Sequence, residues 1–365
     1  MRAPEAGRRY AHPMPRLAEE TIPADEPALI TRLVQQNLAL LNESERPVRR
    51  GQHAKHHGCV LADFEVEPGL PDELRHGLFA EPRSFKALIR FSNGDARDDR
   101  KGDAHGMAIK LFDVPGDKLL EPCDTHDFIL LDQPLFFIRN VADYVGLFDA
   151  LLEAKASVIP KLLFFMPRTA VELGLVYFRF LSDKPHELAI MKRTVSSKPD
   201  TPLATTYHST TPYRLGPHAV RWSAVPDVPK LAKFTGVNAP DKLRHALAMQ
   251  LGGGEASFDF MAQLQTDADT MPIEDPTQPW DAAKSPPRKL ATIRLPVQRP
   301  DTRELMDFCE DLTFNPWRCL PEHRPLGGIN RARRDVYAAV SSRRHELNGV
   351  PQREPTLEAF LALHA

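Results

Sequence analysis

The sequence predicts an α+β fold, in which an antiparallel sheet or barrel lies beside several helices. Between residues 59 and 138, four segments of apolar or alternating residues follow one another at short spacing, and Pro-Gly or Asn-Gly ends three of them. Four such strands favour an antiparallel sheet or barrel. The 34 prolines break long helical patterns and favour strands, turns and arms.

The composition is that of an ordinary globular protein. Of the 365 residues, 42% are hydrophobic and 26% are charged, enough for one large domain or two smaller ones. The formal net charge of −2 gives no overall positive field, so we expect no nucleic-acid partner. No signal peptide and no run of about twenty uncharged apolar residues is visible, so we expect a cytoplasmic protein without a transmembrane segment.

The four cysteines form no recognisable motif. Cys59, Cys123, Cys309 and Cys319 contain no C-x-x-C pair, and the spacing of the last two fits neither a zinc site nor a redox motif. We expect reduced thiols that pack in the interior.

The first 47 residues are predicted to form an arm with one amphipathic helix. The segment LITRLVQQNLALLNE repeats apolar residues at helical spacing. Its apolar face must pack on the main body or on a partner subunit. The four predicted strands that follow are CVLADFEVEPG, FKALIRFSNG, HGMAIKLFDVPG and HDFILLDQPLFFI.

The second half of the chain alternates between helical and strand patterns. From Val141 to Phe180 the pattern is helical and apolar, and Pro160 and Pro167 divide it into several short helices. Four further segments are predicted strands: TTYHSTTPYRLG, HAVRWSAVP, ASFDFMAQLQ and KLATIRLPVQ. Residues 301–365 are helical again, apart from the PEHRPLGG loop.

Near the C-terminal end, INRARRDVYAAVSSRRH places one tyrosine among five arginines. On a helix, Arg333, Tyr337 and Arg344 would lie within roughly 40° of one another. A guanidinium one turn before a phenol can donate a hydrogen bond to its oxygen and favours the phenolate. By itself, the pattern is more typical of a solvated basic face with one core tyrosine.

Two further segments carry chemically active side chains. In RRGQHAKHHG, His53 is a candidate general acid–base, because the pKa of an imidazole lies near neutrality. His56 and His57 suggest a metal cluster, but no carboxylate stands at ligand spacing, so we expect them at the surface. In LIRFSNGD, Arg90 and Ser92 face one side of a strand, where a serine can orient an imidazole and an arginine can bind a carboxylate.

Each of these patterns is weak alone, but their order is informative. HAK before a strand, RFS, HGMAIKLFD, QPLFFIRN and Arg-x3-Tyr-x6-Arg together resemble the haem-dependent catalase family, from about Pro47 to His345. The resemblance implies a catalase-like antiparallel β-barrel with helices packed at one end and an N-terminal arm. It divides the chain into the arm (1–47), a haem domain (48–345) and a C-terminal helical tail (346–365).

The resemblance also implies haem b with ferric iron as the cofactor. Tyr337 resembles the phenolate ligand of the iron, and Arg333 the arginine that donates a hydrogen bond to that phenolate. His53 resembles the histidine on the distal side of the haem, and Ser92 the serine that orients it. The remaining candidate haem contacts are Arg50, Arg90, Phe136, Tyr144 and Arg344.

The sequence departs from the family at Leu131, where catalases carry an asparagine that donates a hydrogen bond to peroxide. A shift of one residue would instead turn Asp132 toward the haem, so both positions remain open. Tyr144 replaces a phenylalanine, and residues 150–200 are unusually apolar. We interpret that region as lining or capping the access route, with simple core packing as an equal alternative.

These features imply a haem enzyme that consumes hydroperoxides, a catalase-related peroxidase with weak catalase activity. His53 would move a proton between the peroxide oxygens, and an organic electron donor of unknown identity would complete the turnover. The expected substrate is a peroxide or an organic hydroperoxide, and arm exchange implies a homo-oligomer. Two alternatives remain: a lyase or allene oxide synthase acting on a fatty-acid hydroperoxide, and a haem-binding protein without turnover. His53 and Ser92 argue against the latter, because pure binding needs neither.

Overall fold

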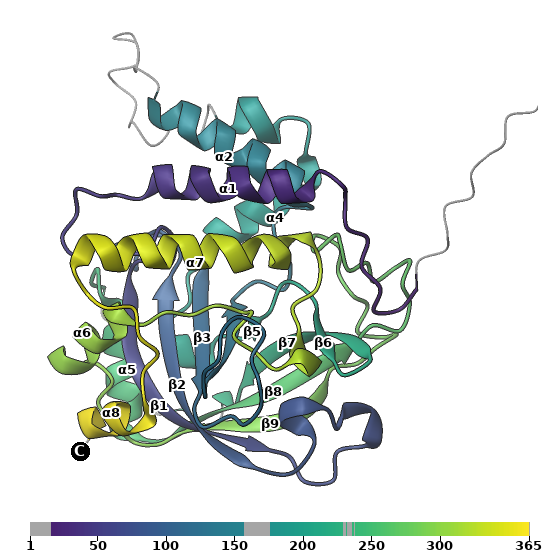
Figure 1. The fold of residues 1–365 in the computed structure, drawn as a ribbon. Helices are drawn as coiled ribbons and strands as arrows, with labels where there is room; N and C mark the ends of the chain where they lie inside the picture. The colour runs from purple at the N-terminus through teal and green to yellow at the C-terminus, as the bar shows by residue number, and fades with distance from the viewer. Residues whose placement is uncertain (1–15, 157–175, 229–230, 232–235, 237, 365) are drawn as a thin grey trace, which may run out of the picture.

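The protein is built on a closed antiparallel barrel, seen in a computed structural model that describes residues 16–156, 176–228, 231, 236 and 238–364 (Figure 1). The sheet order is β5-β4-β3-β2-β1-β9-β8-β7-β6. The strands are β1 (His56–Val66), β2 (Ser84–Asn93), β3 (His105–Leu111), β4 (His126–Leu131), β5 (Tyr207–His208), β6 (Tyr213–Leu215), β7 (His218–Pro226), β8 (Ala256–Leu264) and β9 (Arg288–Leu295). The predicted α+β barrel is confirmed.

The short strand β5 closes the barrel. It pairs with β4 through Leu131 and His208, and with β7 through Tyr207 and Ala224. Eight strands therefore form a closed ring, and β6 is an addition at the edge of β7. All the pairs are antiparallel.

Aromatic side chains fill the interior of the barrel. The ring of Phe260 lies 5.2 Å from Phe64 and 4.8 Å from Phe128, between ring centroids, and all three residues are almost fully buried. Eight strands leave an interior just wide enough for side chains. A large ligand must therefore bind outside the barrel wall, between the strands and the helices that cover them.

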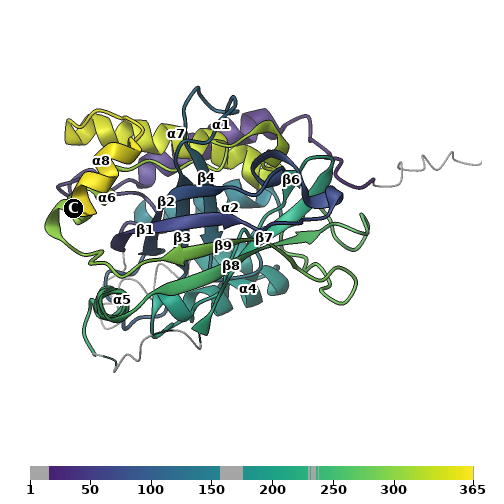
Figure 2. The ribbon, with the colours of Figure 1, turned by 90° about the horizontal axis from the view of Figure 1, so that it is seen from below.

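Helices cover one end and one side of the barrel (Figures 1 and 2). The longer helices are α1 (Glu26–Leu40), α2 (Val141–Ala156), α4 (Pro185–Val195), α5 (Lys242–Gly253), α6 (Arg303–Asp311) and α7 (Gly328–Asn348). The short ones are α8 (Leu357–Leu361), a π-helical turn (Tyr177–Leu181) and 3-10 turns at Asp72–Leu74, Gly77–Phe79, Pro202–Ala204, Pro321–His323 and Ala362–His364. No helix among these described segments is both long and apolar enough to cross a membrane.

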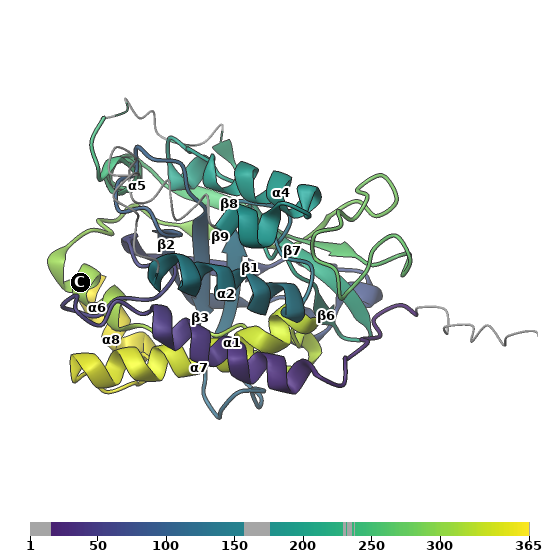
Figure 3. The ribbon, with the colours of Figure 1, turned by 90° about the horizontal axis from the view of Figure 1, so that it is seen from above.

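The predicted helix of the arm is α1, and it packs on its own chain. Figure 3 shows α1 running beside α7, with α2 on its other flank. Leu33 is fully buried in a cluster with Val145, Phe148 and Ala332 from these two helices. The sequence left open whether this helix packs on the main body or on a partner subunit, and in the structure it packs on the main body. Residues 1–15 of the arm lie outside the described residues.

Helix α7 carries the arginine-rich motif and is fixed at both ends. At its start, the guanidinium of Arg331 lies 2.5 Å from carboxylate oxygens of Glu20 and Glu26 and 2.9 Å from Glu274. At its end, Gly349 adopts a left-handed conformation (φ 65°) that suits glycine as a helix cap. The predicted boundary at residue 345 falls inside this helix, which continues to Asn348.

The C-terminal tail is anchored to the barrel by a partly buried carboxylate. Glu354 accepts hydrogen bonds from Lys110 (2.6 Å), Thr125 (2.9 Å) and Thr313 (2.8 Å), and it pairs with Arg318 (3.0 Å). Lys110 is fully buried, and Glu354 pairs with its ammonium group, because an unpaired buried charge would strongly destabilise the fold. The tail is thus part of the same packed body.

The expectation that His56 and His57 lie at the surface is wrong. They are 5% and 1% exposed. The register of β1 shifts between His56 and Gly58, so the strict alternation of a strand fails there. His57 hydrogen-bonds Asn93, and Nε2 of His56 lies 3.5 Å from Glu310. In the described part of the chain, no group of His, Cys, Asp or Glu is arranged to hold a metal ion.

Candidate functional site

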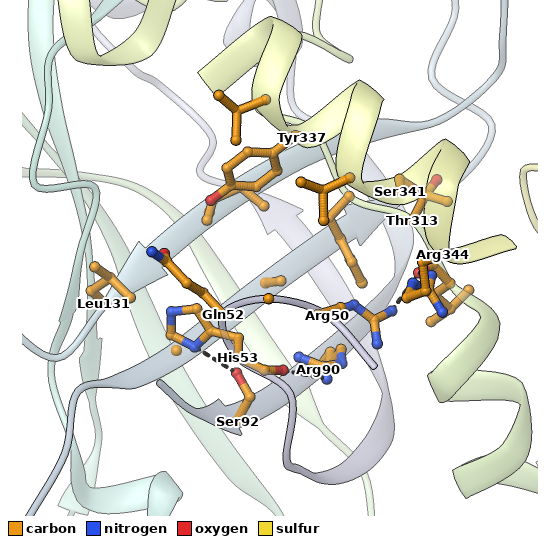
Figure 4. A pocket seen from close by; sticks show the side chains of 18 of the residues that line it. Arg50, Gln52, His53, Arg90, Ser92, Leu131, Thr313, Tyr337, Ser341 and Arg344 are labelled. Atoms are coloured by element: carbon orange, nitrogen blue, oxygen red, sulfur yellow. Dashed lines mark hydrogen bonds between the residues drawn. The ribbon is translucent and has the colours of Figure 1, made fainter. Parts of the chain in front are cut away.

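A large cavity lies between the outer face of the barrel and helix α7. Its empty volume is about 890 Å³, including the part open to solvent. Strands β2, β3 and β4 form the barrel side of the cavity wall. In β2, the alternate residues Ile89 and Phe91 point into the barrel core instead. Figure 4 shows the side chains around the cavity. The polar and charged ones are Asn37, Arg50, Gln52, His53, Arg90, Ser92, Thr313, Tyr337, Ser341 and Arg344.

Helix α7 contributes one stripe of side chains to this cavity. Val336, Tyr337, Val340, Ser341 and Arg344 recur at helical spacing and line the same wall. The phenol of Tyr337 points into the cavity (Figure 4). Within the described part of the chain, no hydrogen bond engages its oxygen, so this oxygen is available to a ligand in the cavity.

Arg333, which was expected to contact Tyr337, points elsewhere. Its guanidinium donates to Thr211 Oγ1 (3.2 Å) and Asn330 Oδ1 (3.3 Å) and lies 5.2 Å from the ring centre of Phe136. It is not among the residues that line the cavity. Tyr337 and Arg344 therefore line the same cavity wall, and Arg333 is not part of that wall.

His53 faces the cavity from the loop before β1, in a strained backbone conformation. Its φ of 56° is left-handed, which is uncommon for a residue with a side chain. Three contacts hold it there: its N–H donates to Gly94 O (2.6 Å), its carbonyl accepts from Arg90 (2.8 Å), and Nδ1 hydrogen-bonds Ser92 Oγ (3.1 Å). Such over-determined strain is typical of functional residues.

The imidazole of His53 is neutral at physiological pH. Burial and the positive charge of Arg90 lower its pKa to about 3. Because Ser92 engages Nδ1, Nε2 is the nitrogen left for a molecule in the cavity. His53 can therefore accept a proton from such a molecule and later return it.

Gly106 provides the space for this imidazole. It pairs with Ser92 across β2 and β3, and a Cβ built on it would lie 2.8 Å from His53 Nδ1 and 2.9 Å from Ser92 Oγ. Such contacts are too close for a real side chain. Gly106 was not among the predicted site residues, although a glycine at the start of a predicted strand is a signal of close approach by a neighbouring group.

Three arginines gather at one end of the cavity: Arg90 and Arg344 are buried, and Arg50 is partly buried. Burial and neighbouring guanidinium groups lower the pKa of Arg50 and of Arg90 to about 10, and burial also lowers the pKa of Arg344. The carboxylate of Glu310 lies 3.3 Å from Arg50 and 4.0 Å from Arg344. Nε of Arg90 is buried without a hydrogen-bond partner. Three cations against one carboxylate leave net positive charge, which favours a ligand with one or more anionic groups.

No protein-family model and no curated protein matches the sequence, but solved structures match the fold. A fungal catalase crystal structure has a TM-score of 0.63 at 17% identity and matches 95% of this chain over 69% of its own. Catalase A from Saccharomyces cerevisiae gives 0.63 at 18% identity, over 94% of this chain and 70% of its own. A bacterial catalase gives 0.61 at 16% identity, over 97% and 71%.

This chain has the catalase fold. The order of segments that suggested a catalase-like barrel is therefore borne out by the arrangement of strands and helices in three dimensions. At these identities the likeness concerns the fold, so the chemistry must be argued from the residues of this chain.

Within this catalase fold, Leu131 and not Asp132 faces the cavity. Leu131 pairs with Gly106 in the ladder between β3 and β4, and it lines the cavity wall near His53 (Figure 4). Asp132 turns the other way, where its carboxylate accepts hydrogen bonds from His105 (2.8 Å) and Ser197 (2.6 Å). Burial alone would raise the pKa of Asp132, but the hydrogen bonds and charge of His105 lower it.

Phe136 and Tyr144, expected to contact the cofactor, are not in the described cavity wall. Their rings lie 5.6 Å apart, edge to face, and Tyr144 belongs to α2, so Phe136 packs against this helix. Burial raises the pKa of Tyr144.

Gln52 is a cavity residue that the sequence did not reveal. Its side chain is exposed to the cavity and lies between those of Tyr337 and His53 in Figure 4. In an extended chain, the neighbours Gln52 and His53 would point in opposite directions. The left-handed turn at His53 brings both to the same space. Gln52 thus brings a carboxamide into the cavity, although position 131, where an asparagine would be expected from the resemblance, carries a leucine.

The apolar stretch VIPKLLFFMP, interpreted as part of the access route, belongs to residues 157–175 and lies outside the described residues. The four cysteines are free thiols, and three of them are buried.

Proposed function

We propose that this protein binds haem b in the cavity and processes hydroperoxides there, with organic hydroperoxides preferred over hydrogen peroxide. One observation carries the proposal: the free phenol of Tyr337 and the neutral imidazole of His53 line one cavity, with three arginines at its end. This arrangement suits a flat ligand that has a metal at its centre and carboxylates at its edge.

The residues present fit ferric haem. The phenol oxygen of Tyr337 would be the iron ligand, as a phenolate. Arg50, Arg90 and Arg344 would hold the two propionates, and the unpartnered Nε of Arg90 supplies a donor that now lacks an acceptor. Apolar side chains such as Ile129 and Val340 line the remaining wall. When bound, haem supplies the redox-active iron that cleaves the O–O bond of a hydroperoxide.

The protein's own contribution to the reaction centres on His53. Its neutral imidazole accepts the proton of an incoming hydroperoxide and delivers it to the departing oxygen. Ser92 fixes the ring through Nδ1, and Gly106 leaves room for it. A protein that only stores haem would need neither the strained backbone nor this hydrogen bond.

Leu131 and Gln52 would decide which hydroperoxide is handled. Leu131 gives bulk and no hydrogen bond, which disfavours the binding of small polar hydrogen peroxide beside His53. The carboxamide of Gln52 can donate one hydrogen bond to a hydroperoxide oxygen. Weak dismutation of hydrogen peroxide and better turnover of an apolar hydroperoxide follow, with an organic molecule as the electron donor.

A lyase or allene oxide synthase acting on a fatty-acid hydroperoxide is the second candidate, because the apolar lining and Leu131 favour it equally. It needs no external electron donor. Product analysis without added reductant separates the two: rearranged fatty-acid products indicate the second candidate, and hydroperoxide that disappears only with a donor indicates a peroxidase. A homo-oligomer in the cytoplasm stays a prediction.

Optical spectroscopy of the purified protein tests the haem site itself. We expect a high-spin ferric spectrum of a tyrosinate-ligated haem after addition of one equivalent of hemin, and a spectral change on addition of cumene hydroperoxide. A protein that gains no such spectrum would refute haem binding. A normal spectrum without any response to hydroperoxide would refute the enzymatic part alone.

A further inference from the structure

The C-terminal tail makes a direct contact with the wall of the cavity. Residues 312–314 line the cavity, and Thr313 lies at the same end as Arg344 (Figure 4). The hydroxyl of Thr313 donates a hydrogen bond to Oε1 of Glu354 in the tail (2.8 Å). Glu354 is not among the described residues that line the cavity, so it contacts the wall without facing the ligand space.

The same wall segment orients two of the arginines at the end of the cavity. The carbonyl oxygen of Leu312 accepts hydrogen bonds from Arg50 and from Nη2 of Arg344 (3.1 Å). Nη1 of Arg344 donates to the carbonyl oxygen of Glu310 (2.7 Å), near the end of α6. Because one acceptor atom serves both guanidinium groups, a displacement of Leu312 would move both of them. Leu312 is the residue before Thr313, which Glu354 holds.

Two buried cations keep the carboxylate of Glu354 in place. Nζ of Lys110 lies 2.6 Å and Nη2 of Arg318 lies 3.0 Å from its oxygens. Both cations also pair with Asp127, at 2.7 Å and 2.8 Å. Burial on its own would raise the pKa of Glu354, but the charges of Lys110 and Arg318 and the hydrogen bonds lower it. The carboxylate is therefore ionised and accepts the proton of the Thr313 hydroxyl.

A second contact of the tail, through Phe360, holds the helix that precedes the wall segment. The ring of Phe360 stacks 5.8 Å from that of Phe112 and 5.9 Å from that of Phe308, between ring centroids. Phe112 directly follows β3, and Phe308 lies in α6. Phe360 is fully buried in a cluster that also contains Leu312. The tail therefore joins the barrel to the segment that carries the shared carbonyl oxygen.

We propose that Glu354 is a positioning residue of the cavity. Through Thr313 it fixes residues 312–314, and through the carbonyl oxygen of Leu312 it fixes the guanidinium groups of Arg50 and Arg344. Glu354 touches no ligand. It acts on the retention of the ligand, because the paired hydrogen bonds between an arginine and a carboxylate depend on the orientation of the guanidinium. The inference rests on the proposed function only for the identity of that ligand.

Thr125 provides a matched control within the same network. Its hydroxyl donates to Oε2 of Glu354 (2.9 Å), but it is not among the residues described in the cavity wall. Changing either threonine to valine removes one hydrogen bond to the same carboxylate. If Glu354 only stabilised the fold, Thr125→Val and Thr313→Val would behave alike. Under the proposal, both lose stability, and only Thr313→Val releases the ligand faster, by about tenfold for one hydrogen bond to a charged group.

The rate of hemin release from the full-length protein and urea unfolding measure the two effects separately. Glu354→Ala should release hemin about tenfold faster than the wild type. Glu354→Gln should recover part of this loss, because its amide oxygen still accepts from Thr313. The double variant Glu354→Ala/Thr313→Val should release hemin no faster than Glu354→Ala, since both changes break the same bond.

Amide hydrogen exchange of residues 312–314 tests the positioning role without hemin. Exchange should be faster in Thr313→Val than in Thr125→Val, and this pair decides even if Glu354→Ala fails to fold. Equal exchange in the two threonine variants would overturn the proposal. So would unchanged hemin release in Glu354→Ala, which would give Thr313 a direct contact with the ligand instead. A wild-type protein that binds no hemin would refute the proposed function alone, and the exchange experiment would still decide this inference.

Discussion

Gly106 lies so close to His53 that a Cβ at this position would come within 2.8 Å of the imidazole nitrogen Nδ1. We predict that Gly106→Ala moves the ring, breaks its hydrogen bond with Ser92 and slows the reaction with hydroperoxide by about 10²–10⁴-fold, the usual contribution of a general acid–base. The rate of the haem spectral change in stopped flow measures this. The control is Gly252→Ala, because nothing lies within 4 Å of that Cβ, and its rate should equal that of the wild type.

Replacing the proposed iron ligand should remove or loosen the haem. Tyr337→Phe keeps the ring in the cavity wall but offers no oxygen to the iron. The haem content per chain and the ferric spectrum measure the loss. Tyr213→Phe, inside the barrel, should retain haem. A normal high-spin spectrum from Tyr337→Phe would exclude Tyr337 as the ligand.

An amide at position 131 should increase the release of oxygen from hydrogen peroxide. Leu131→Asn puts a hydrogen-bond donor on the wall beside His53, and one such bond is worth about 1–1.5 kcal/mol, or about tenfold in rate. An oxygen electrode measures the effect. Leu131→Ala, which removes bulk without adding a donor, separates the two causes. Wild-type oxygen release at the rate of an ordinary catalase would contradict the role given to Leu131.

Removing the carboxamide of Gln52 should weaken the use of organic hydroperoxides. Gln52→Leu preserves the size of the side chain and deletes its donor, so we expect kcat/KM for cumene hydroperoxide to fall by about three- to tenfold at unchanged haem content. Asn37→Leu is the matched control, because the amide of Asn37 already donates to Leu33 O (2.8 Å) within its own helix. Equal losses in the two variants would remove Gln52 from the site.

Acid should destabilise the protein through its buried histidines. Burial lowers the pKa of His57 and of His323 from 6.5 to about 3. Between these values the unfolded chain binds protons that the folded chain excludes, so the free energy of unfolding falls as the pH drops from 6.5 toward 3. Above about pH 6.5 these groups contribute no pH dependence.

Urea unfolding at pH 7, 6, 5 and 4 measures this dependence. His323→Gln is the informative variant, because an amide oxygen can still accept the hydrogen bond from the Leu78 N–H and does not titrate. Its slope with pH should be smaller than that of the wild type. An unfolding free energy that stays constant from pH 6.5 to 4 would show that these histidines are protonated in the folded protein.

The barrel was predictable because its strands alternate apolar and polar residues and end at turn dipeptides, and both signals are local. Arg90 and Ser92 were correctly placed on one face for the same reason. The choice between Leu131 and Asp132 was not predictable, since the side-chain period of two makes a shift of one residue invisible without the neighbouring strand.

Other features depended on contacts between distant segments. His56 and His57 were assigned to the surface, but a register shift in β1 and contacts with Glu310 and Asn93 bury both. Arg333 stands one turn before Tyr337, as expected, but Thr211 and Asn330 attract its guanidinium. Except for Asn330, which stands three residues before Arg333, these partners are distant in sequence, so local spacing could not predict them.

Through the carboxylates around Arg331, the N-terminal segment helps to position helix α7 and therefore the proposed haem site, although most of this segment does not line the cavity. Glu20, Glu26 and Glu274 come from separate parts of the chain and converge on one guanidinium, six residues before Tyr337 on the same rigid helix. The orientation of the phenol is therefore set partly from the far end of the sequence. An N-terminal truncation that removes Glu20 and Glu26 would produce the spectrum of a damaged iron site while every residue in the cavity wall remained intact.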